Sequence, residues 1–161
     1  MRINTDKLIK VSVMGQVSHP VKGQDHVEPG VSVKNIERAD SYTQGYNRTF
    51  NALACIGNEA LIVSGDAKGE KGVVTGKHGG IEHILIDFPP ETLERLVIGD
   101  KILVKAYGQG LELLDYPEIK VMNLDPDLLL KMPLKEANGR LRIGGDPYNP
   151  CPYNGFWTWS R

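Results

Sequence analysis

The sequence predicts a mainly β fold, a small antiparallel barrel with additional strands and one or two short helices. Three observations lead to this expectation. Short apolar stretches alternate with polar residues at period two, which is the spacing of side chains on one face of a strand. Glycine (18 residues) and proline (10 residues) are frequent in the chain of 161 and interrupt these stretches at short intervals. About eight or nine short strands and two small helices result, a spacing typical of barrels and sandwiches.

The N-terminal third contains two expected strands and a long loop. From Ile9 to Val13, apolar and polar residues alternate, which predicts a half-buried strand. Residues 18–30 are expected to form a loop because they contain His-Pro and Pro-Gly pairs, and a short strand follows at 31–33. Residues 34–50 are polar with interspersed aromatic side chains, so they are expected to form a long loop.

The middle of the chain holds most of the expected barrel. Residues 51–56 and 60–64 are expected strands on either side of a Gly-Asn turn, and a further strand runs from Gly80 to Phe88. Two prolines end that strand. Because side chains alternate between the two faces of a strand, every second residue of each strand is expected to point into the barrel. The expected core residues are Ile62, Val74, Ile84, Ile86 and Leu103.

The C-terminal third combines short strands with two short helical segments. A helix is expected at 126–132 because Asp125 is a favoured N-cap and Pro126 suits the first helical position. The other expected elements are helical turns at 91–96, strands at 101–107, 111–114, 119–122 and 141–143, and a hairpin turn at Asn138-Gly139.

Three regions follow from this pattern. Residues 1–50 supply N-terminal strands and the long loop, and residues 51–143 supply the barrel core, with which 1–50 is expected to form one domain. Residues 144–161 are expected to be an irregular tail rich in aromatic residues and proline. This tail contains both tryptophans of the chain and no Ala, Val, Ile, Leu or Met.

Charge and cysteine content limit the possible partners and compartments. Lys and Arg number 19 against 20 Asp and Glu, so the net charge of −1 makes a broadly basic nucleic-acid surface unexpected. The two cysteines, Cys55 and Cys151, do not suit a disulfide-stapled secreted domain. The N-terminus has no signal-type apolar stretch, and no apolar run approaches the roughly 20 residues of a spanning helix. A soluble cytoplasmic protein is therefore expected.

The segment from Leu61 to Phe88 resembles the KOW motif of ribosomal and transcription-elongation proteins. The matching residues are Gly65, Lys68, Gly69, Gly72 and Val74, followed by the apolar strand Ile84-Leu85-Ile86. The resemblance implies a small SH3-like or KOW-like barrel, in which glycines permit tight turns. It also raises the hypothesis of a nucleic-acid or ribosome-binding module, although the segment has no aromatic platform for base stacking.

A larger resemblance covers residues 8–143. The chain resembles a bacterial and archaeal family known as domain of unknown function 4438. The matching motifs are Gly45-Tyr46-Asn47, Phe50-Asn51, Cys55-Ile56-Gly57-Asn58, Ser64-Gly65-Asp66-Ala67-Lys68-Gly69, Thr75-Gly76-Lys77-His78-Gly79-Gly80 and Ala106-Tyr107-Gly108-Gln109-Gly110. The resemblance implies a mainly β fold and assigns no reaction or catalytic residue.

The tail departs from this family. Its members are roughly twice as long and continue into a glycine-rich segment of the type Met-Gly-Ser-Gly-Leu-Gly. Codons for Asn154-Gly155-Phe156-Trp157-Thr158-Trp159, shifted by one base, can spell that segment. We therefore expect a truncated protein, in which an N-terminal portion is followed by residues read out of frame after about residue 143. An aromatic docking tail is the alternative.

The densest polar cluster is Lys77-His78-Gly79-Gly80 together with His83. A glycine-flanked turn exposes backbone N–H groups, and Lys68 and Lys71 lie nearby in the sequence, so the cluster is a candidate site for a small anion. The alternative is a solvated hairpin with solubilising lysines. The loop Tyr107-Gly108-Gln109-Gly110 either lines a cleft or forms a simple turn. The expected ligand-binding residues are thus Lys68, Lys77, His78, Gly79, Gly80, His83, Tyr107 and Gln109.

No cofactor is expected from the sequence, and one metal hypothesis stays open. His78 and His83 would form a zinc pair if Asp66, Glu82 or Asp87 supplied a third ligand. A divalent metal is therefore an alternative to a small anion at this cluster.

Three functions remain from the sequence alone. The first is a protein that binds a small anionic metabolite and forms half of a metabolic enzyme. The second is a KOW-like nucleic-acid or ribosome-binding module, and the third is a structural or assembly domain without a ligand. The chain has no Ser-His-Asp order, phosphate-binding loop or dinucleotide fingerprint, so no catalytic residue is identified. Self-association is expected to use exposed apolar surface and the aromatic tail, without a membrane.

Overall fold

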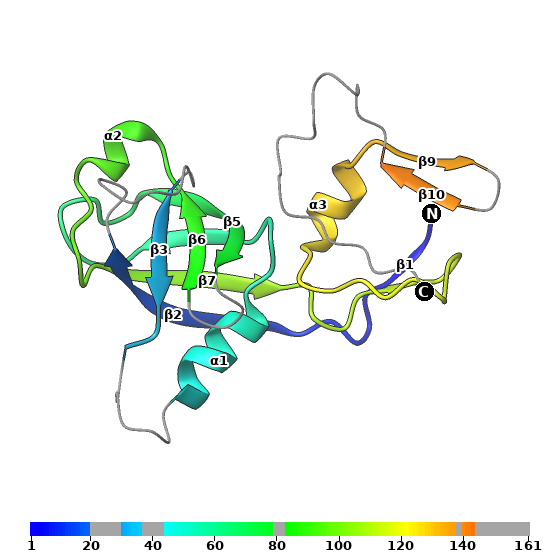
Figure 1. Cartoon of the computed structure of the whole chain (residues 1–161), viewed down its shortest axis with the longest axis horizontal. Helices are drawn as coiled ribbons and strands as arrows, with labels where there is room; N and C mark the ends of the chain where they lie inside the picture. Colours follow the sequence, from blue (N-terminus) through cyan, green and yellow to red (C-terminus); the bar gives the residue numbers. More distant parts are fainter. Residues whose placement is uncertain (20–29, 37–43, 79–82, 138–139, 144–161) are drawn as a thin grey trace.

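The structure is a computed structural model that describes residues 1–19, 30–36, 44–78, 83–137 and 140–143. A barrel forms one part of the molecule, and a smaller assembly of α3, β1, β9 and β10 lies beside it (Figure 1). The expectations for Gly79, Gly80, the Asn138-Gly139 turn and the tail at 144–161 lie outside the described residues.

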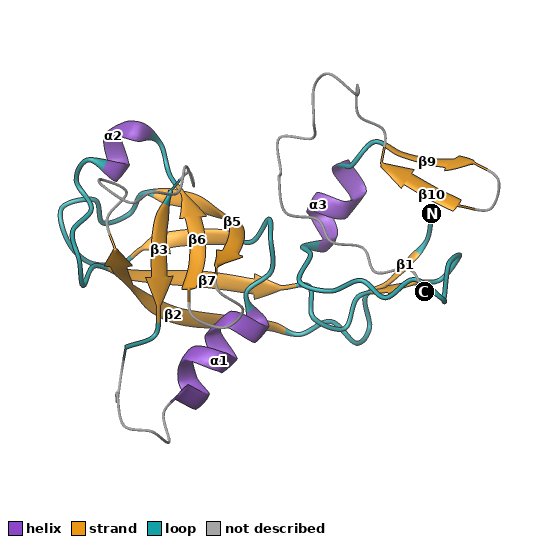
Figure 2. Ribbon diagram, viewed as in Figure 1, coloured by secondary structure: helices purple, strands orange, loops and turns teal. Residues whose placement is uncertain are grey.

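Six strands close the barrel in the order β2-β3-β6-β5-β4-β7, and every neighbouring pair is antiparallel. The strands are β2 (Lys10–His19), β3 (Val31–Lys34), β4 (Glu59–Ile62), β5 (Lys71–His78), β6 (His83–Asp87) and β7 (Lys101–Tyr107). The prediction of a mainly β fold with a small antiparallel barrel and short helices is confirmed (Figure 2).

Alternation along the strands fills the barrel interior. Ile62, Val74, Ile84 and Ile86 are buried as predicted. The prediction for Leu103 is wrong, because β7 places its even-numbered residues inside and leaves Leu103 half-buried. The buried residues of β7 are Ile102, Val104 and Ala106.

Helix α1 (Gln44–Leu53) replaces two predicted elements. The long loop at 34–50 and the strand at 51–56 were both expected, whereas the chain is helical through residue 53 and Ile56 makes only an isolated bridge to Leu124. Phe50 of the helix is buried, and so is Ala54, which lies four positions later and just past the last helical residue, so this side of α1 packs on the barrel. At Gly15 on β2, a Cβ would come within 2.7 Å of the Phe50 ring, so the glycine makes room for the helix.

The two other helices agree with the sequence. Helix α2 (Pro90–Leu93) overlaps the first half of the helical turns expected at 91–96. Helix α3 (Pro126–Lys131) begins as predicted, with the Asp125 carboxylate accepting hydrogen bonds from the N–H groups of Asp127 (2.7 Å) and Leu128 (3.2 Å). No helix among the described residues has the length and apolar character needed to cross a bilayer.

A second cluster of apolar residues lies outside the barrel. Its buried members are Leu111, Leu113, Leu124 and Leu129. Two small sheets surround it, one pairing β1 (Ile3–Asn4) with β8 (Glu112–Leu113) and the other pairing β9 (Leu134–Ala137) with β10 (Arg140–Ile143). The strand expected at 119–122 is reduced to a bridge between Lys120 and Glu112.

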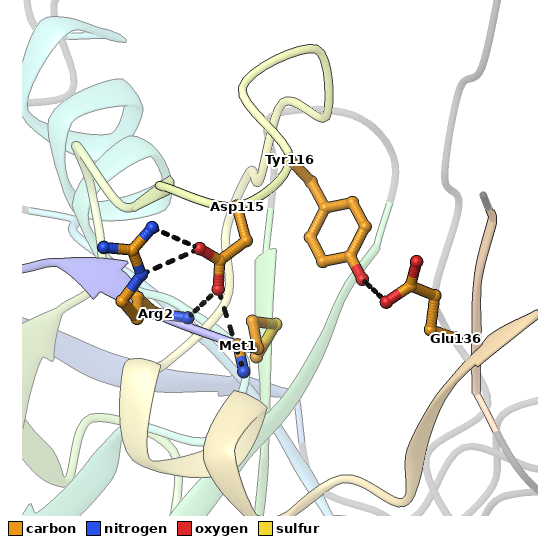
Figure 3. A network of polar contacts seen from close by, with 5 residues as sticks. All are labelled: Met1, Arg2, Asp115, Tyr116 and Glu136. Carbon is orange, nitrogen blue, oxygen red and sulfur yellow. Dashed lines mark hydrogen bonds and ion pairs between the residues drawn. The ribbon is translucent and has the colours of Figure 1, made fainter.

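Polar contacts fix the N-terminus to this second cluster (Figure 3). The Arg2 guanidinium pairs with Asp115 at 2.7 Å, and the Met1 ammonium lies 3.8 Å from the same carboxylate. Beside them, the Tyr116 hydroxyl donates a 2.7 Å hydrogen bond to Glu136 on β9. The first residues of the chain are thereby held against the segment that follows the barrel.

Candidate functional site

Two of the predicted ligand-binding residues meet at the side chain of Asn123. The Lys77 ammonium donates a hydrogen bond to Asn123 Oδ1 at 2.7 Å, and Gln109 Nε2 donates to the same oxygen at 3.0 Å. Lys77 also donates to the Asn51 carbonyl, and Gln109 to the Ala52 carbonyl. We refer to Asn51, Ala52, Lys77, Gln109 and Asn123 as the Asn123 cluster.

The cluster forms where α1 ends against the barrel. The last four carbonyls of a helix have no partner within the helix. Here each of these carbonyls has a donor from outside the helix. The N–H group of Ala54 donates to the Phe50 carbonyl at 3.1 Å, and the Cys55 thiol makes a weak contact of 3.5 Å with the Leu53 carbonyl. The Asn51 carbonyl accepts from Lys77, and the Ala52 carbonyl accepts from Gln109.

Asn123 is held in a conformation that few side chains adopt. Its φ of 57° is the one positive value that the described non-glycine residues show. Asparagine tolerates this region better than most residues. In this conformation the backbone carbonyl of Asn123 accepts a 2.8 Å hydrogen bond from the N–H group of Ile56. The side-chain oxygen of Asn123 accepts from Lys77 and Gln109.

In the part of the chain that the structure describes, the Lys77 ammonium has no acidic hydrogen-bond partner. It is half-buried, and within the described part of the chain its hydrogen-bond acceptors are the uncharged oxygens of Asn51 and Asn123. Burial lowers the pKa of the Lys77 ammonium, and the nearby Cys55 raises it. The charge also lies at the C-terminal end of α1, where the helix dipole stabilises a cation.

The Cys55 thiol stays neutral at physiological pH. Burial raises the pKa of Cys55 to about 11, which outweighs the opposite effect of Lys77, and Asp125 raises it further. At that pH the thiol is a poor nucleophile and offers Lys77 no negative charge, since Cys55 becomes charged only as the pH approaches its pKa. Cys55 is completely buried, so it packs as a small hydrophobic residue.

A second polar network lies directly beside the cluster and is built on Asn58. This residue is fully buried. Its Oδ1 accepts from the N–H groups of Cys55 (2.7 Å) and Tyr107 (3.2 Å), while its Nδ2 donates to the Tyr107 carbonyl and to Asp125 Oδ2, both at 2.8 Å. All four hydrogen-bonding positions of the amide are used, which makes this network rigid.

One buried polar atom of the cluster has no partner. Asn51 is 5% exposed, and its Nδ2 donates to the Asn47 carbonyl at 2.9 Å. Its Oδ1 accepts no hydrogen bond from the described residues. A buried acceptor left unpaired has a free-energy cost of about 1–3 kcal/mol, so a donor at this position would stabilise the cluster.

The other predicted residues lie in different places. Lys68 is exposed in the turn before β5, whereas Lys77 lies near the end of that strand, so the structure does not bring them together. Tyr107 contributes its backbone to the Asn58 network, and its ring lies 4.3 Å from the Lys10 ammonium. His78 ends β5 and pairs in register with half-buried His83 on β6.

The described residues do not contain a set of ligands for the metal that the sequence left as an alternative. No group of three or more His, Cys, Asp or Glu side chains is arranged there to hold a metal ion. The residues that sequence reasoning missed are Asn51, Asn58 and Asn123. The partners that bring them to the site lie 14 to 67 positions away in the chain, so neighbouring residues do not reveal these contacts.

An open groove lies between the barrel and α3. It has a volume of about 500 Å³ and mixes basic and acidic side chains from β2, β4, β7 and the start of α3. Its lining residues are Lys10, Val11, Ser12, Glu59, Lys105, Ala106, Tyr107, Asp125 and Asp127. Tyr107 is the one predicted ligand-binding residue among them. Because Lys105 already pairs with Glu59 at 2.5 Å, much of the groove's charge is internally compensated.

A family model and a solved structure both match this chain. The sequence model of the family described as "Domain of unknown function (DUF4438), N-terminal" matches residues 9–130. Among solved structures, the chain is similar to the crystal structure of TM1086, with 41% sequence identity and a TM-score of 0.77. The similarity covers 89% of this chain and 60% of TM1086, so the chain spans about three-fifths of that protein. No curated protein matches the chain.

Proposed function

The chain belongs to the DUF4438 N-terminal domain family, and we propose that its barrel binds a small anionic metabolite at Lys77. One observation carries this function. Lys77 is a half-buried cation whose partners among the described residues are uncharged oxygens. Removing an ammonium group from water is unfavourable unless an opposite charge accompanies it. An anionic ligand would supply that charge.

The hydrogen bonding of Lys77 leaves room for such a ligand. An ammonium group has three N–H donors, and the cluster uses two of them, on Asn51 and Asn123. The third is available to a phosphate or carboxylate oxygen. The two occupied donors fix the direction of the third, so the lysine is oriented before a ligand arrives.

The neighbours of Lys77 favour an anion over a cation. The Cys55 thiol is neutral because of its raised pKa of about 11, and Asn123 presents an oxygen that Lys77 and Gln109 already occupy. His83 begins the strand paired with β5, at the same end of the barrel as Lys77. The expected role of His78 and His83 as further ligand contacts remains part of this proposal.

The proposed role is binding, with chemistry supplied from elsewhere. The lysine and the neutral amides of the Asn123 cluster orient an anion, and the proposal gives His78 and His83 a binding role with no assigned part in a reaction. In a family protein of the length of TM1086, a reaction would therefore use groups from the part of the chain outside the match. In this proposal the chain is the metabolite-binding half of a metabolic enzyme.

Thermal unfolding with inorganic phosphate or succinate tests the proposal. Either ligand is expected to raise the melting temperature of the full chain above that in potassium chloride of equal ionic strength, because ligands stabilise the state that binds them. The increase should disappear in Lys77→Gln and persist in Lys77→Arg. Lys101→Gln, which removes an exposed lysine from β7, is the matched control and should retain it. An equal increase in Lys77→Gln and the parent would contradict the proposal.

A further inference from the structure

The N-terminal half of β2 has a strand neighbour on one side only. Strand β7 pairs with β2 from Lys10 to Gln16, whereas β3 pairs with β2 only from Gln16 onward. Figure 1 shows β2 and β7 running side by side toward the end of the barrel that lies nearest α3. The first residues of β2 therefore form an edge that no described strand covers.

The alternation of backbone hydrogen bonds identifies the groups on this edge. In an antiparallel pair, every second residue directs both of its backbone groups to the same neighbouring strand. The N–H group of Val17 donates to the Asp100 carbonyl, just before β7, at 2.9 Å. The odd-numbered residues of β2 therefore face β7. The even-numbered residues face the other side, where the Met14 carbonyl accepts from Asn35 Nδ2 at 3.1 Å.

Lys10 and Ser12 consequently present unpaired backbone groups at the edge. Each directs one N–H and one C=O there, and no described residue binds these four groups. Both residues are exposed, and so is Val11 between them. The Lys10 ammonium lies 4.3 Å from the centroid of the Tyr107 ring on β7, so its charge is held on the β7 side of the strand. An exposed edge of this kind is a template for pairing with another chain.

Apolar side chains accompany the unpaired groups. Ile9, Val11 and Val13 share one face of the strand, because successive side chains alternate. Ile9 is 44% exposed and Val11 is 41% exposed, while Val13 packs against the barrel core. The Ile9 N–H donates to the Gln109 carbonyl at 3.0 Å, so the extended chain begins one residue before β2. A strand added at this edge would cover the two exposed side chains.

The edge is complementary to itself. When two copies run antiparallel about Val11, Lys10 lies opposite the partner's Ser12, and Val11 lies opposite the partner's Val11. The four edge groups of each chain then bind those of the other, so none stays unpaired. On the apolar face, Ile9 lies opposite the partner's Val13. The single charge of the stretch faces a neutral hydroxyl, so no like charges meet.

The neighbouring registers do not satisfy these conditions. A shift of one residue sets edge-facing residues against residues that face β7, so the backbone groups no longer match. A shift of two residues in one direction places Lys10 opposite the partner's Lys10, which opposes like charges. A shift of two in the other direction places Lys10 opposite the partner's Met14, whose carbonyl already binds Asn35. The register about Val11 satisfies both the backbone and the charges.

We propose that two copies of the chain form a dimer by antiparallel pairing of β2 with the partner's β2 along the edge from Lys10 to Ser12. A continuous sheet in the order β7-β2-β2-β7 results. The contact uses no residue of the Asn123 cluster, so this inference does not depend on the proposed anion binding. Because the paired stretch is short, the dimer forms reversibly and its population rises with protein concentration.

Analytical ultracentrifugation of the full chain tests the dimer. A monomer–dimer equilibrium is expected, and Val11→Glu should raise its dissociation constant about tenfold or more, because it sets two carboxylates directly opposite each other. Ile98→Glu is the matched control, since Ile98 is 65% exposed but lies in the turn before β7. It should leave the constant unchanged. A parent that stays monomeric at its highest soluble concentration, or a dimer that Val11→Glu does not weaken, would overturn the proposal.

Two substitutions of Ser12 test the register. Ser12→Glu places a carboxylate opposite the partner's Lys10 and should tighten the dimer several-fold at low salt, whereas Ser12→Lys should weaken it. Each new side chain also faces Lys105 of its own chain, in monomer and dimer alike. The net charge of −1 predicts the opposite order, because Glu adds to it and Lys cancels it. Equal constants or the reverse order, in variants whose circular dichroism matches the parent, would overturn this register.

A disulfide provides the direct measurement of the contact. In the proposed register, the two copies of Val11 form a non-hydrogen-bonded pair with Cα atoms about 4.5 Å apart, within the range of roughly 4.4–6.8 Å that a disulfide spans. Val11→Cys in a Cys151→Ser background should therefore cross-link two chains under mild oxidation. Cys55 is completely buried and does not compete. Ile98→Cys in the same background should stay monomeric, and equal cross-linking of the two variants would contradict the proposal.

Discussion

The side chain of Asn58 donates a 2.8 Å hydrogen bond to the carboxylate of Asp125, and both residues are buried. Asn58 lies immediately before β4 of the barrel, and Asp125 caps α3 in the second cluster. The two oxygens of Asp125 are thus divided between the barrel and the helix, with Oδ1 on α3 and Oδ2 on Asn58. This contact links the closed barrel to the second apolar cluster.

Replacing Asn58 is expected to destabilise both parts. Asn58→Ala removes four hydrogen bonds and leaves the N–H groups of Cys55 and Tyr107 unsatisfied in a buried site. The free energy of unfolding should fall by about 3 kcal/mol, because each buried unpaired group costs about 1–3 kcal/mol and the effects are not additive. Urea denaturation followed by circular dichroism measures the change.

Thr49→Ala is the control for that experiment. Thr49 is exposed, and its hydroxyl binds the carbonyl of Gly45 one turn earlier in α1. The expected change is within about 0.5 kcal/mol, as for most surface substitutions. A loss for Asn58→Ala no greater than that for Thr49→Ala would show that the network contributes little to stability.

Gly108, which follows β7, and Gly99, which precedes it, provide a matched test of close packing. Both have positive φ, 142° and 95° respectively, so alanine is strained at either position. A Cβ on Gly108 would lie 2.2 Å from the Leu124 carbonyl oxygen and 2.9 Å from Cys55 Sγ, whereas one on Gly99 meets nothing within 4 Å. We expect Gly99→Ala to cost about 1 kcal/mol and Gly108→Ala about 3 kcal/mol or more.

Chemical denaturation of the two variants measures that difference. Similar losses for both would mean that the segment around Leu124 moves aside without cost. Circular dichroism of each variant before denaturation checks that the barrel has formed, since the comparison concerns two folded proteins.

The fold could largely be predicted from sequence because strand alternation is local. Ile84 and Ile86 occupy the interior as their spacing implies. Leu103 was misplaced because apolar residues stand at consecutive positions in β7, so alternation does not show which of them point inward. Helix α1 was missed because polar Asn51 occupies part of its buried face, and that hides the helical spacing of Phe50 and Ala54.

The candidate site could be predicted only in part. Lys77 and Gln109 stand out in sequence because glycines surround them, and they meet at one oxygen of Asn123. The contacts that place Asn58 and Asn123 at the site come from distant segments: 67 positions separate Asn58 from Asp125, and 46 separate Lys77 from Asn123. Such pairings become visible only when the barrel closes and α3 packs beside it.

Cys55 should make the stability of the protein depend on pH above neutrality. Its pKa is about 11 in the folded chain, against 9.0 for an unperturbed thiol. Below pH 9 both states keep the proton, and the full contribution to stability is present. Between pH 9 and 11 the unfolded chain releases its proton first, so the free energy of unfolding falls as pH rises.

Cys55→Ala isolates this effect. Relative to the variant, the parent should lose about 2 kcal/mol of unfolding free energy between pH 9 and 11, since one pKa unit corresponds to about 1.4 kcal/mol. Lys77, whose pKa burial lowers, titrates in both proteins and affects both profiles. Urea denaturation at several pH values gives the two curves, and parallel curves would contradict the prediction.

The β9–β10 hairpin contains an unfavourable charge pair that one substitution should convert into a favourable one. Arg142 lies directly opposite Lys135 in the antiparallel register, and both are exposed. Like charges at directly opposed positions destabilise a strand pair, and opposite charges stabilise it by roughly 0.2–1 kcal/mol. Arg142→Glu should therefore slow amide exchange in β9 and β10 about twofold or more at low salt, and the effect should shrink at high salt because ions screen exposed charges. Arg140→Glu changes the same net charge opposite Ala137, so equal slowing in that control would point to overall charge and not to the pair.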